Sequence, residues 1–447
     1  MENLKDLISK YETSGPRYTS YPTAPHFTPD VDKAKLKSLA LASDSPLSLY
    51  IHIPFCQSLC WFCGCTSSVC RDWKLVDDYL DLIQKELELW RDNGMTKRIL
   101  KQIHFGGGTP NFLNVEQIYR LGEIIKKYFT IDDDCEFSAE LDPRTLTQEK
   151  VEAFVKIGIN RASIGIQDTN ADVQKAINRI QPHERNLDAS RWLRNAGVKE
   201  LNIDLIYGLP LQTSTTFEKT LSDAMEIQPT RIALFGYAHV PWMKSAQKNL
   251  EKNPLPTGEQ KVDIFVLAKK FFEQNGYEYV GLDHFAKPDD ALIQARKNGT
   301  LHRNFQGYTT HAGLDNFAIG LTSISETKTS YRQNFKLMDD YKKSVEAGIL
   351  PIERGIILNA DDILRRGVIM DIMCSLKVRY GNYGVDFKKM FESAFPKLFE
   401  MEKDSLVKLN DDGFEVLPLG RLFLRNIAML FRLLSLKRLS NCFKSNT

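Results

Sequence analysis

The chain has 447 residues, of which 43% are hydrophobic and 26% charged, and its formal net charge is +2. This composition excludes gross disorder, and the small net charge gives no strong basic field for nucleic acid. No apolar run reaches the roughly 18 residues of a membrane span, and the N-terminus shows no signal-peptide pattern. We therefore expect a cytoplasmic, monomeric protein with no membrane span, built from one large α/β domain and an appendage.

The predicted elements begin after an N-terminal arm. The arm is rich in Pro, Ser, Thr and Tyr, and we interpret it as irregular apart from one short helix near residues 32–42. From residue 48, β-rich runs alternate with amphipathic stretches. The expected strands span residues 48–53, 102–105, 136–140, 161–166, 201–207 and 231–237. The expected helices between them span residues 75–93, 115–128, 148–157, 184–196 and 215–227.

Six such units predict a parallel sheet covered by helices. Because a complete TIM barrel needs eight units, we predict a partial (β/α)6 TIM-like barrel that is open on one side. A helix over 258–275 and a strand over 277–282 would close it, and the chain then looks α-rich from about residue 331. The predicted domains are an arm, a barrel with its closing segment and an α-rich C-terminal domain, spanning residues 1–45, 46–330 and 331–447.

Five of the eight cysteines lie within fifteen residues, which is too clustered for a disulfide framework and favours metal in a reducing compartment. Cys56, Cys60 and Cys63 form a CxxxCxxC motif directly after the first expected strand. A [4Fe-4S] cluster usually takes four thiolates, so three leave one iron open to a substrate or cofactor. Structural zinc, which prefers four closed ligands in two pairs, and a redox-active dithiol are the less favoured alternatives.

A glycine-rich string, FGGGTPNFL at 105–113, follows the second expected strand. Three consecutive glycines allow the backbone to approach a ligand closely, although a tight turn would look the same.

CxxxCxxC on the first strand-to-helix loop is the signature of the radical S-adenosylmethionine (SAM) superfamily. Within it, the chain resembles the oxygen-independent coproporphyrinogen III oxidases from about residue 14 to residue 431. The resemblance is carried in order by the strings SGPRYTSYPTA, LYIHIPFCQSLCWFCGC, HFGGGTP, AELDPR, IGIQD with INRIQ, IDLIYGLPLQT, GYAHVP, LDHFAKPDD and LHRNFQGYTT. The related radical SAM haem chaperones, which generally lack Cys65, the YTSYPTA arm and HRNFQGYTT, are the alternative.

The resemblance implies an activity in haem (porphyrin) biosynthesis. Members of the family decarboxylate two propionates of coproporphyrinogen III oxidatively, which gives the vinyl groups of protoporphyrinogen IX. The reaction uses a 5′-deoxyadenosyl radical from SAM, cleaved at a [4Fe-4S] cluster, and the family is thought to bind two SAM molecules. A small redox protein or another electron donor is the implied partner, together with the tetrapyrrole substrate.

The resemblance also implies binding residues. The cluster ligands would be Cys56, Cys60 and Cys63. The positions around the SAM on the cluster are Tyr50, Gly107, Glu140, Ala238 and Ile324. Those around a second SAM are Phe62, Gly108, Thr109, Gln167, Arg179 and Asp204. Taken without the resemblance, Glu140 and Asp204 are equally typical of helix caps or ion pairs, Ala238 and Ile324 of core, and Arg179 of a solvated charge.

No catalytic residue is assigned from the sequence. A tetra-acidic substrate requires cations, and the candidates are Arg17, His52, His104, His239, His284 and Arg303. Tyr18 and Tyr21 of the arm would either close the site or provide aromatic packing. Cys65 has the wrong spacing for a fourth ligand, so its role stays open. The last residues, 432–447, depart from the family pattern, which indicates either a frayed end or altered substrate closure.

Overall fold

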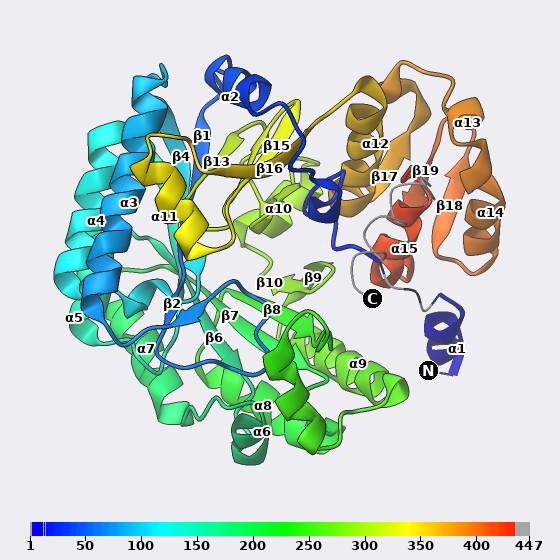
Figure 1. Ribbon diagram of the computed structural model, residues 1–447. Coiled ribbons are helices and arrows are strands. Elements are labelled where there is room, and N and C mark those ends of the chain that lie inside the picture. The colour runs from blue at the N-terminus through cyan, green and yellow to red at the C-terminus, as the bar shows by residue number, and fades with distance from the viewer. Residues whose placement is uncertain (1, 12, 14, 434–447) are drawn as a thin grey trace.

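A large sheet organises the computed structural model, which describes residues 2–11, 13 and 15–433 (Figure 1). Its order is β16-β15-β14-β13-β1-β4-β5-β6-β7-β8-β10-β9. The six strands from β1 to β8 in this order are parallel neighbours and confirm the six predicted strands. They are β1 (Leu47–Ile53), β4 (Ile99–Gly107), β5 (Thr130–Leu141), β6 (Arg161–Gln167), β7 (Glu200–Tyr207) and β8 (Arg231–Gly236).

The helices between these strands pack on the outside of the curved sheet (Figure 1). They are α3 (Trp73–Asp92), α4 (Val115–Tyr128), α5 (Gln148–Ile157), α6 (Ala171–Ala176), α7 (His183–Asn195) and α8 (Ser214–Glu226), followed by α9 (Gly258–Gln274). Polar caps fix where several begin, because an N-cap side chain satisfies a free backbone N–H. Asn114 and Thr213 form capping boxes at α4 and α8. Only the short α6 was not predicted.

The sheet extends on both sides of the six predicted strands. β13 (Asp315–Ile319) pairs in parallel with β1, and β14 (Ile324–Thr327), β15 (Ser330–Asn334) and β16 (Ile352–Ile357) follow as antiparallel strands, with α11 (Met338–Glu346) between the last two. On the other side β9 (Glu278–Gly281) and β10 (His284–Ala286) form a hairpin against β8. The sheet therefore continues to Ile357, beyond the predicted boundary at residue 330, and the division into domains stays a prediction.

The C-terminal part forms a second hydrophobic core beside the barrel (Figure 1). It has a three-stranded sheet of β17 (Lys377–Arg379), β19 (Gly413–Val416) and β18 (Val407–Asn410). Its helices are α12 (Ala360–Met370), α13 (Phe387–Met390), α14 (Phe395–Lys403) and α15 (Leu424–Met429), and α10 (Ala291–Lys297) contributes side chains to the same core. No helix in the described part of the chain is long and apolar enough to cross a membrane.

The first part of the N-terminal arm, up to Tyr21, packs on this second core. The predicted helix near residues 32–42 is confirmed as α2 (Lys33–Leu41), but the arm also begins with α1 (Glu2–Lys10), which was not predicted. Tyr11 packs edge-on against Phe423 and donates a hydrogen bond to Asp404. Tyr18 and Tyr21 are buried in the same core, so they pack as aromatic side chains, and the Tyr21 hydroxyl accepts from the Leu433 N–H. Residues 434–447, most of the divergent C-terminus, lie outside the described residues.

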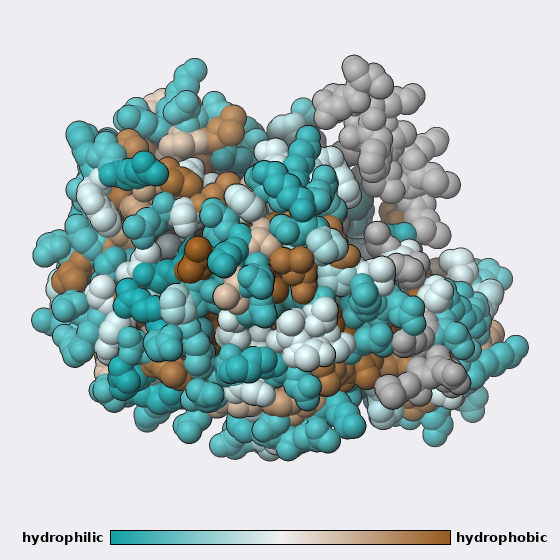
Figure 2. Space-filling model, turned by 90° about the horizontal axis from the view of Figure 1, so that it is seen from below, coloured by the Kyte–Doolittle hydropathy of each residue, from teal (hydrophilic) through white to brown (hydrophobic). Residues whose placement is uncertain are grey.

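Figure 2 shows the molecule from below the view of Figure 1, from the side on which α6 and α8 lie. This face is mainly hydrophilic, with hydrophobic groups scattered across its middle. Residues at or just after the carboxyl ends of β1, β4, β5 and β6 line one cleft, at the end of the strands where β/α proteins bind ligands.

A fully buried carboxyl group connects α3 to the antiparallel extension. Glu86 accepts hydrogen bonds from the Gly320 N–H (2.9 Å), the Tyr341 hydroxyl (2.6 Å) and the Asn334 side-chain amide (2.7 Å). Burial raises the pKa of Glu86 to about 7, although the three donors oppose that shift.

Glu86 should make stability depend on pH. Between about pH 4.5 and 7 the folded chain keeps a proton that the unfolded chain has lost, so the free energy of unfolding falls as the pH rises. Glu86→Gln cannot titrate and should remove at most about 3 kcal/mol of this fall. Urea unfolding at pH 5, 6 and 7 measures how the free energy of unfolding changes with pH. Glu123→Gln, which replaces an exposed carboxyl group, is the control. If the free energy of unfolding of Glu86→Gln falls with pH as steeply as that of the parent, the raised pKa of Glu86 is contradicted.

Candidate active site

The CxxxCxxC loop is held at its base by a small parallel pair of strands. β2 (Phe55–Cys56) follows β1 and pairs with β3 (Ser68–Val69). The Cys70 N–H donates to the Cys56 carbonyl (3.0 Å), and the Trp61 N–H donates to the Ile177 carbonyl at the end of α6 (3.0 Å). The loop between the two strands is thus fixed both at its ends and near its middle.

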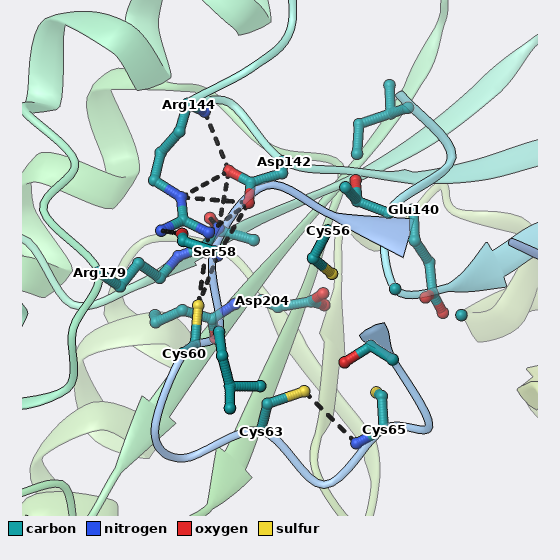
Figure 3. Close-up of a pocket in the computed structure, with 18 of the residues that line it drawn as sticks. Cys56, Ser58, Cys60, Cys63, Cys65, Glu140, Asp142, Arg144, Arg179 and Asp204 are labelled. Carbon is teal, nitrogen blue, oxygen red and sulfur yellow. Dashed lines mark hydrogen bonds and ion pairs between the residues drawn. The ribbon is translucent and has the colours of Figure 1, made fainter. Parts of the chain in front are cut away.

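The predicted ligands Cys56, Cys60 and Cys63 line one cleft of about 170 Å³. Figure 3 shows their sulfur atoms turned toward the same space. A tetrahedral zinc ion with Zn–S bonds of 2.3 Å needs sulfurs about 3.8 Å apart. Among the described residues, however, only His183, Asp223 and Glu226 bring three ligand atoms within 4.8 Å of one another. At least one pair of the three sulfur atoms is therefore more than 4.8 Å apart, which is wider than tetrahedral zinc requires.

Cys65 lies beside this trio and acts on Cys63. Its backbone N–H donates to the Cys63 sulfur at 3.4 Å. Hydrogen bonding from the Cys65 thiol, reinforced by this N–H and by the charges of Lys244 and Arg179, lowers the pKa of Cys63 to about 6 against the effect of burial. The lowered pKa favours the thiolate form, in which Cys63 would bind iron.

A buried ion-pair network lies next to Cys60 (Figure 3). Asp142 contacts both Arg144 (2.6 Å) and Arg179 (3.2 Å), and each guanidinium also donates to the Cys60 sulfur at 3.4 Å. Burial opposes ionisation of Asp142, but the two arginines outweigh it and lower its pKa to about 2. Arg179 is 6% exposed, so it is not a solvated charge, and its Nε has no hydrogen-bond partner among the described residues.

Asp142 and Arg144 were not singled out from the sequence. They stand in the string AELDPR, which carries part of the family resemblance, and their proximity to Cys60 depends on the alignment of β5 with the cysteine loop.

The glycine string leaves room for a ligand beside the cysteines. A Cβ at Gly108 would lie 2.9 Å from the Cys56 sulfur and 2.6 Å from the Phe55 carbonyl oxygen. Gly107 has a φ of +123°, which side chains rarely adopt, and its Cβ would lie 2.8 Å from the Ile53 carbonyl oxygen. The chain therefore requires glycine at both positions, because this loop packs closely against the backbone before and within the cysteine loop.

Two carboxyl groups of the cleft have opposite pKa shifts. Burial opposes ionisation of Glu140, but hydrogen bonding from His104 outweighs it and lowers the pKa of Glu140. Burial, together with the charge of Glu140, raises the pKa of Asp204 to about 7. Near neutral pH the site therefore offers an ionised acceptor at Glu140 and a protonated fraction at Asp204.

The structure brings most of the predicted SAM residues into the cleft with the cysteines. These are Phe62, Gly107, Gly108, Thr109, Glu140, Gln167, Arg179 and Asp204. Three others do not line it. Tyr50 stacks beside His104 at 5.9 Å, and the carbonyl of Ala238 is linked to that of Phe62 through the amide of Gln247. Ile324 begins β14.

A second cavity of about 370 Å³ adjoins the first and shares Cys65, Glu140, Ser163 and Asp204 with it. Of the candidate cations it contains His104 and His284. Arg17 lies beside it, above the ring of Phe235, and Arg303 packs over the ring of Tyr308. His52 contacts the Thr66 carbonyl and Tyr50, and His239 contacts Glu251.

This second cavity also contains two arginines that were not singled out from the sequence, Arg161 and Arg231. Arg161 pairs with Glu136 (2.7 Å) and with Glu200, and Arg231 pairs with Asp290 (2.6 Å). Their strands were predicted, but only the barrel geometry places both guanidinium groups at one cavity.

Comparison with known proteins places the site in a family. Residues 50–224 match the model of the Radical SAM superfamily. An oxygen-independent coproporphyrinogen III oxidase from Escherichia coli is 41% identical over 430 residues, covering 95% of this chain and 94% of the relative. The chain belongs to the oxygen-independent coproporphyrinogen III oxidase family.

Other oxygen-independent coproporphyrinogen III oxidases agree with this assignment. The Synechocystis protein of that name is 39% identical over 442 residues, covering 96% of this chain and 95% of the relative. A solved structure of coproporphyrinogen III oxidase from Escherichia coli, described as a radical SAM enzyme, gives a TM-score of 0.90 at 39% identity, over 96% of this chain and 98% of that one. The family resemblance and the radical SAM fold are confirmed.

Radical SAM membership implies a [4Fe-4S] cluster and SAM, and the donor set fits both. Three thiols converge on one space, glycine backbone lies beside them, and the buried Nε of Arg179 has no partner within the described residues.

Removing Cys63 should abolish the cluster, whereas removing Cys65 should not. Cys63→Ala would leave two of the three converging thiols, so iron content and the broad visible absorbance should fall to near background. Cys65→Ala is the matched control, one thiol lost from the same loop. Iron and sulfide analysis after anaerobic reconstitution measures the cluster content of both variants. Full iron content in Cys63→Ala would contradict the ligand assignment.

Proposed function

We propose that this chain converts coproporphyrinogen III to protoporphyrinogen IX by oxidative decarboxylation without oxygen, in haem biosynthesis. The observation that carries the proposal is identity of 39–41% with named oxidases over nearly the whole of both chains. The convergence of Cys56, Cys60 and Cys63 in one cleft supports it.

The chemistry that the bound cluster and SAM supply is homolytic removal of a hydrogen atom from the substrate. The residues of the chain bind and orient the reactants. Cys56, Cys60 and Cys63 ligate iron. Glu140, ionised and hydrogen-bonded to His104, would accept hydrogen bonds from the amino group of SAM, and Arg179 would pair with a carboxylate.

We further propose two SAM sites. Tyr50, Gly107, Glu140, Ala238 and Ile324 belong to the site at the cluster. Phe62, Gly108, Thr109, Gln167, Arg179 and Asp204 belong to the second site. Gln167 has a φ of +68°, and its side-chain amide lies close to Gly165 and Arg179, so a strained residue marks this part of the cleft.

The substrate's carboxylates fit the second cavity. Arg161 and Arg231 line it, and buried Nε of Arg161 and Nδ1 of His284 have no hydrogen-bond partner in the described part of the chain. Burial, with the charges of Arg303, Arg17 and Arg231, lowers the pKa of His284 to about 3. His284 is therefore neutral at physiological pH and offers one N–H to a carboxylate among positively charged neighbours.

Replacing His284 should weaken substrate use and leave the cluster unchanged. His284→Phe keeps ring packing against Phe235 and Tyr308 but removes the donor. A lost hydrogen bond to a charged group corresponds to roughly a ten- to hundredfold fall in kcat/KM. Steady-state kinetics measure kcat/KM for coproporphyrinogen III. His302→Phe, at another cavity, is the control. An unchanged kcat/KM in His284→Phe would exclude the carboxylate contact.

The decisive test of the activity is anaerobic turnover of the reconstituted protein with a chemical reductant. Addition of SAM and coproporphyrinogen III should release two CO₂ per substrate and give protoporphyrinogen IX, identified by mass spectrometry. SAM cleavage without CO₂ would refute the proposal. Stoichiometric haem binding without decarboxylation would instead indicate the related chaperone, and zinc without iron would exclude radical chemistry.

A further inference from the structure

A basic cleft adjoins the cysteine loop, from which Gln57 and Cys70 line it, and it shares only Arg144 with the cluster cleft. Its volume is about 430 Å³. Four of the residues that line it are cations and none is acidic, within the described part of the chain. The four are Arg71, Arg144, Lys150 and Arg185. The cleft and the cluster cleft share Arg144, which donates to the Cys60 sulfur (Figure 3).

Most of this positive charge is available to a partner. Arg71 and Arg185 are exposed and have no ion pair among the described residues, and the Lys150 ammonium donates only to the Asn111 carbonyl. Asp72, the neighbouring acid, is engaged as the N-cap of α3. Three uncompensated cations around one cleft attract an acidic surface and raise its association rate.

A row of aromatic rings leads from this cleft to the first cluster cysteine. Trp73 is 48% exposed and stacks on Phe112, with ring centroids 4.9 Å apart and planes inclined by 25°. Phe112 packs against Phe55 at 5.9 Å, and Phe55 directly precedes Cys56 in β2. The route from the surface to the cluster ligand is therefore short and tightly packed.

We infer that this cleft docks a small acidic electron-donor protein that reduces the cluster. The inference rests on the proposed function, because a [4Fe-4S] cluster in radical SAM chemistry must receive one electron from outside. In the step, the donor's redox group is oxidised by one electron and the cluster is reduced by one electron. Trp73 supplies the aromatic contact at the centre, and Arg71, Lys150 and Arg185 supply the charge around it.

Two charge-reversal variants test the inference. Arg71→Glu/Arg185→Glu changes the net charge by −4, and Lys343→Glu/Lys389→Glu makes the same change on α11 and α13, outside the cleft. The probe is a reduced acidic flavodoxin. The first variant should weaken flavodoxin binding roughly tenfold or more. The bleaching of the cluster absorbance, which reports its reduction, should slow by a similar factor. The control pair should behave as the parent.

A neutral variant and the salt dependence make the test independent of net charge. Trp73→Ala should also raise the Kd for oxidised flavodoxin, measured on a biosensor. In the parent, the rate of reduction should fall as ionic strength rises from 0.05 to 0.3 M. Equal Kd and rate in parent and cleft variants, or reduction of the parent that is independent of salt, would overturn the inference.

Reduction by dithionite, a small chemical reductant that needs no docking surface, separates the test of this inference from the test of the proposed function. All variants should be reduced by dithionite at the parental rate and should then cleave SAM. Failure of the parent to form a cluster or to cleave SAM with dithionite would refute the proposed function. Normal dithionite chemistry with unaltered flavodoxin kinetics in the cleft variants would refute only the docking site.

Discussion

Three thiols carried by one short loop must be held apart at a distance set by the cluster, and a loop cannot do this alone. Here β2 and β3 hold its two ends together, and the hydrogen bond from the Trp61 N–H to Ile177 fixes its middle. The strand β1, from which the loop departs, is buried along its length between β4 and β13. The rigidity of the parallel sheet is thus transmitted to the sulfur atoms.

The charges around the loop serve two purposes. Arg144 and Arg179 neutralise Asp142 and place donors on the Cys60 sulfur, which favours the thiolate form that iron needs. Glu140 and Asp204 line the same cleft but have different partners, and their pKa values move apart. One part of the cleft therefore suits an anionic ligand and another suits a cationic one, as an amino acid such as the methionyl part of SAM requires.

The repeating part of the fold could be predicted from the sequence, because its strands and helices alternate with distinct periods and clear caps. The bounds predicted for α4 and α5 match the structure. β13 could not be identified in this way, since its residues follow a Gly- and Asn-rich stretch and its place depends on pairing with distant β1. α1 was missed because it is stabilised by Asp404 and Phe423, from the other end of the chain.

The candidate site likewise contains residues that local sequence patterns indicate and residues that only the fold brings together. Cysteine spacing, glycine runs and family strings are local patterns, and they indicated the cluster ligands and the glycine loop. Asp142, Arg161 and Arg231 carry no local signal, because an isolated charge in a strand is equally typical of a surface ion pair. Their importance appears only in the folded chain, where Asp142 follows β5 at the cluster cleft, and Arg161 and Arg231, which begin β6 and β8, meet at the second cavity.

The arm's contacts with the far end of the chain bear on how the protein is made. Arg17 pairs with Asp283 beside the barrel cavity, whereas Tyr11 and Tyr21 contact Asn426 and Leu433. A ribosome releases those last partners hundreds of residues after the cysteine loop has emerged. Until then Tyr11 and Tyr21 lack these partners, so this part of the arm takes its final position only after residues 426–433 have been synthesised.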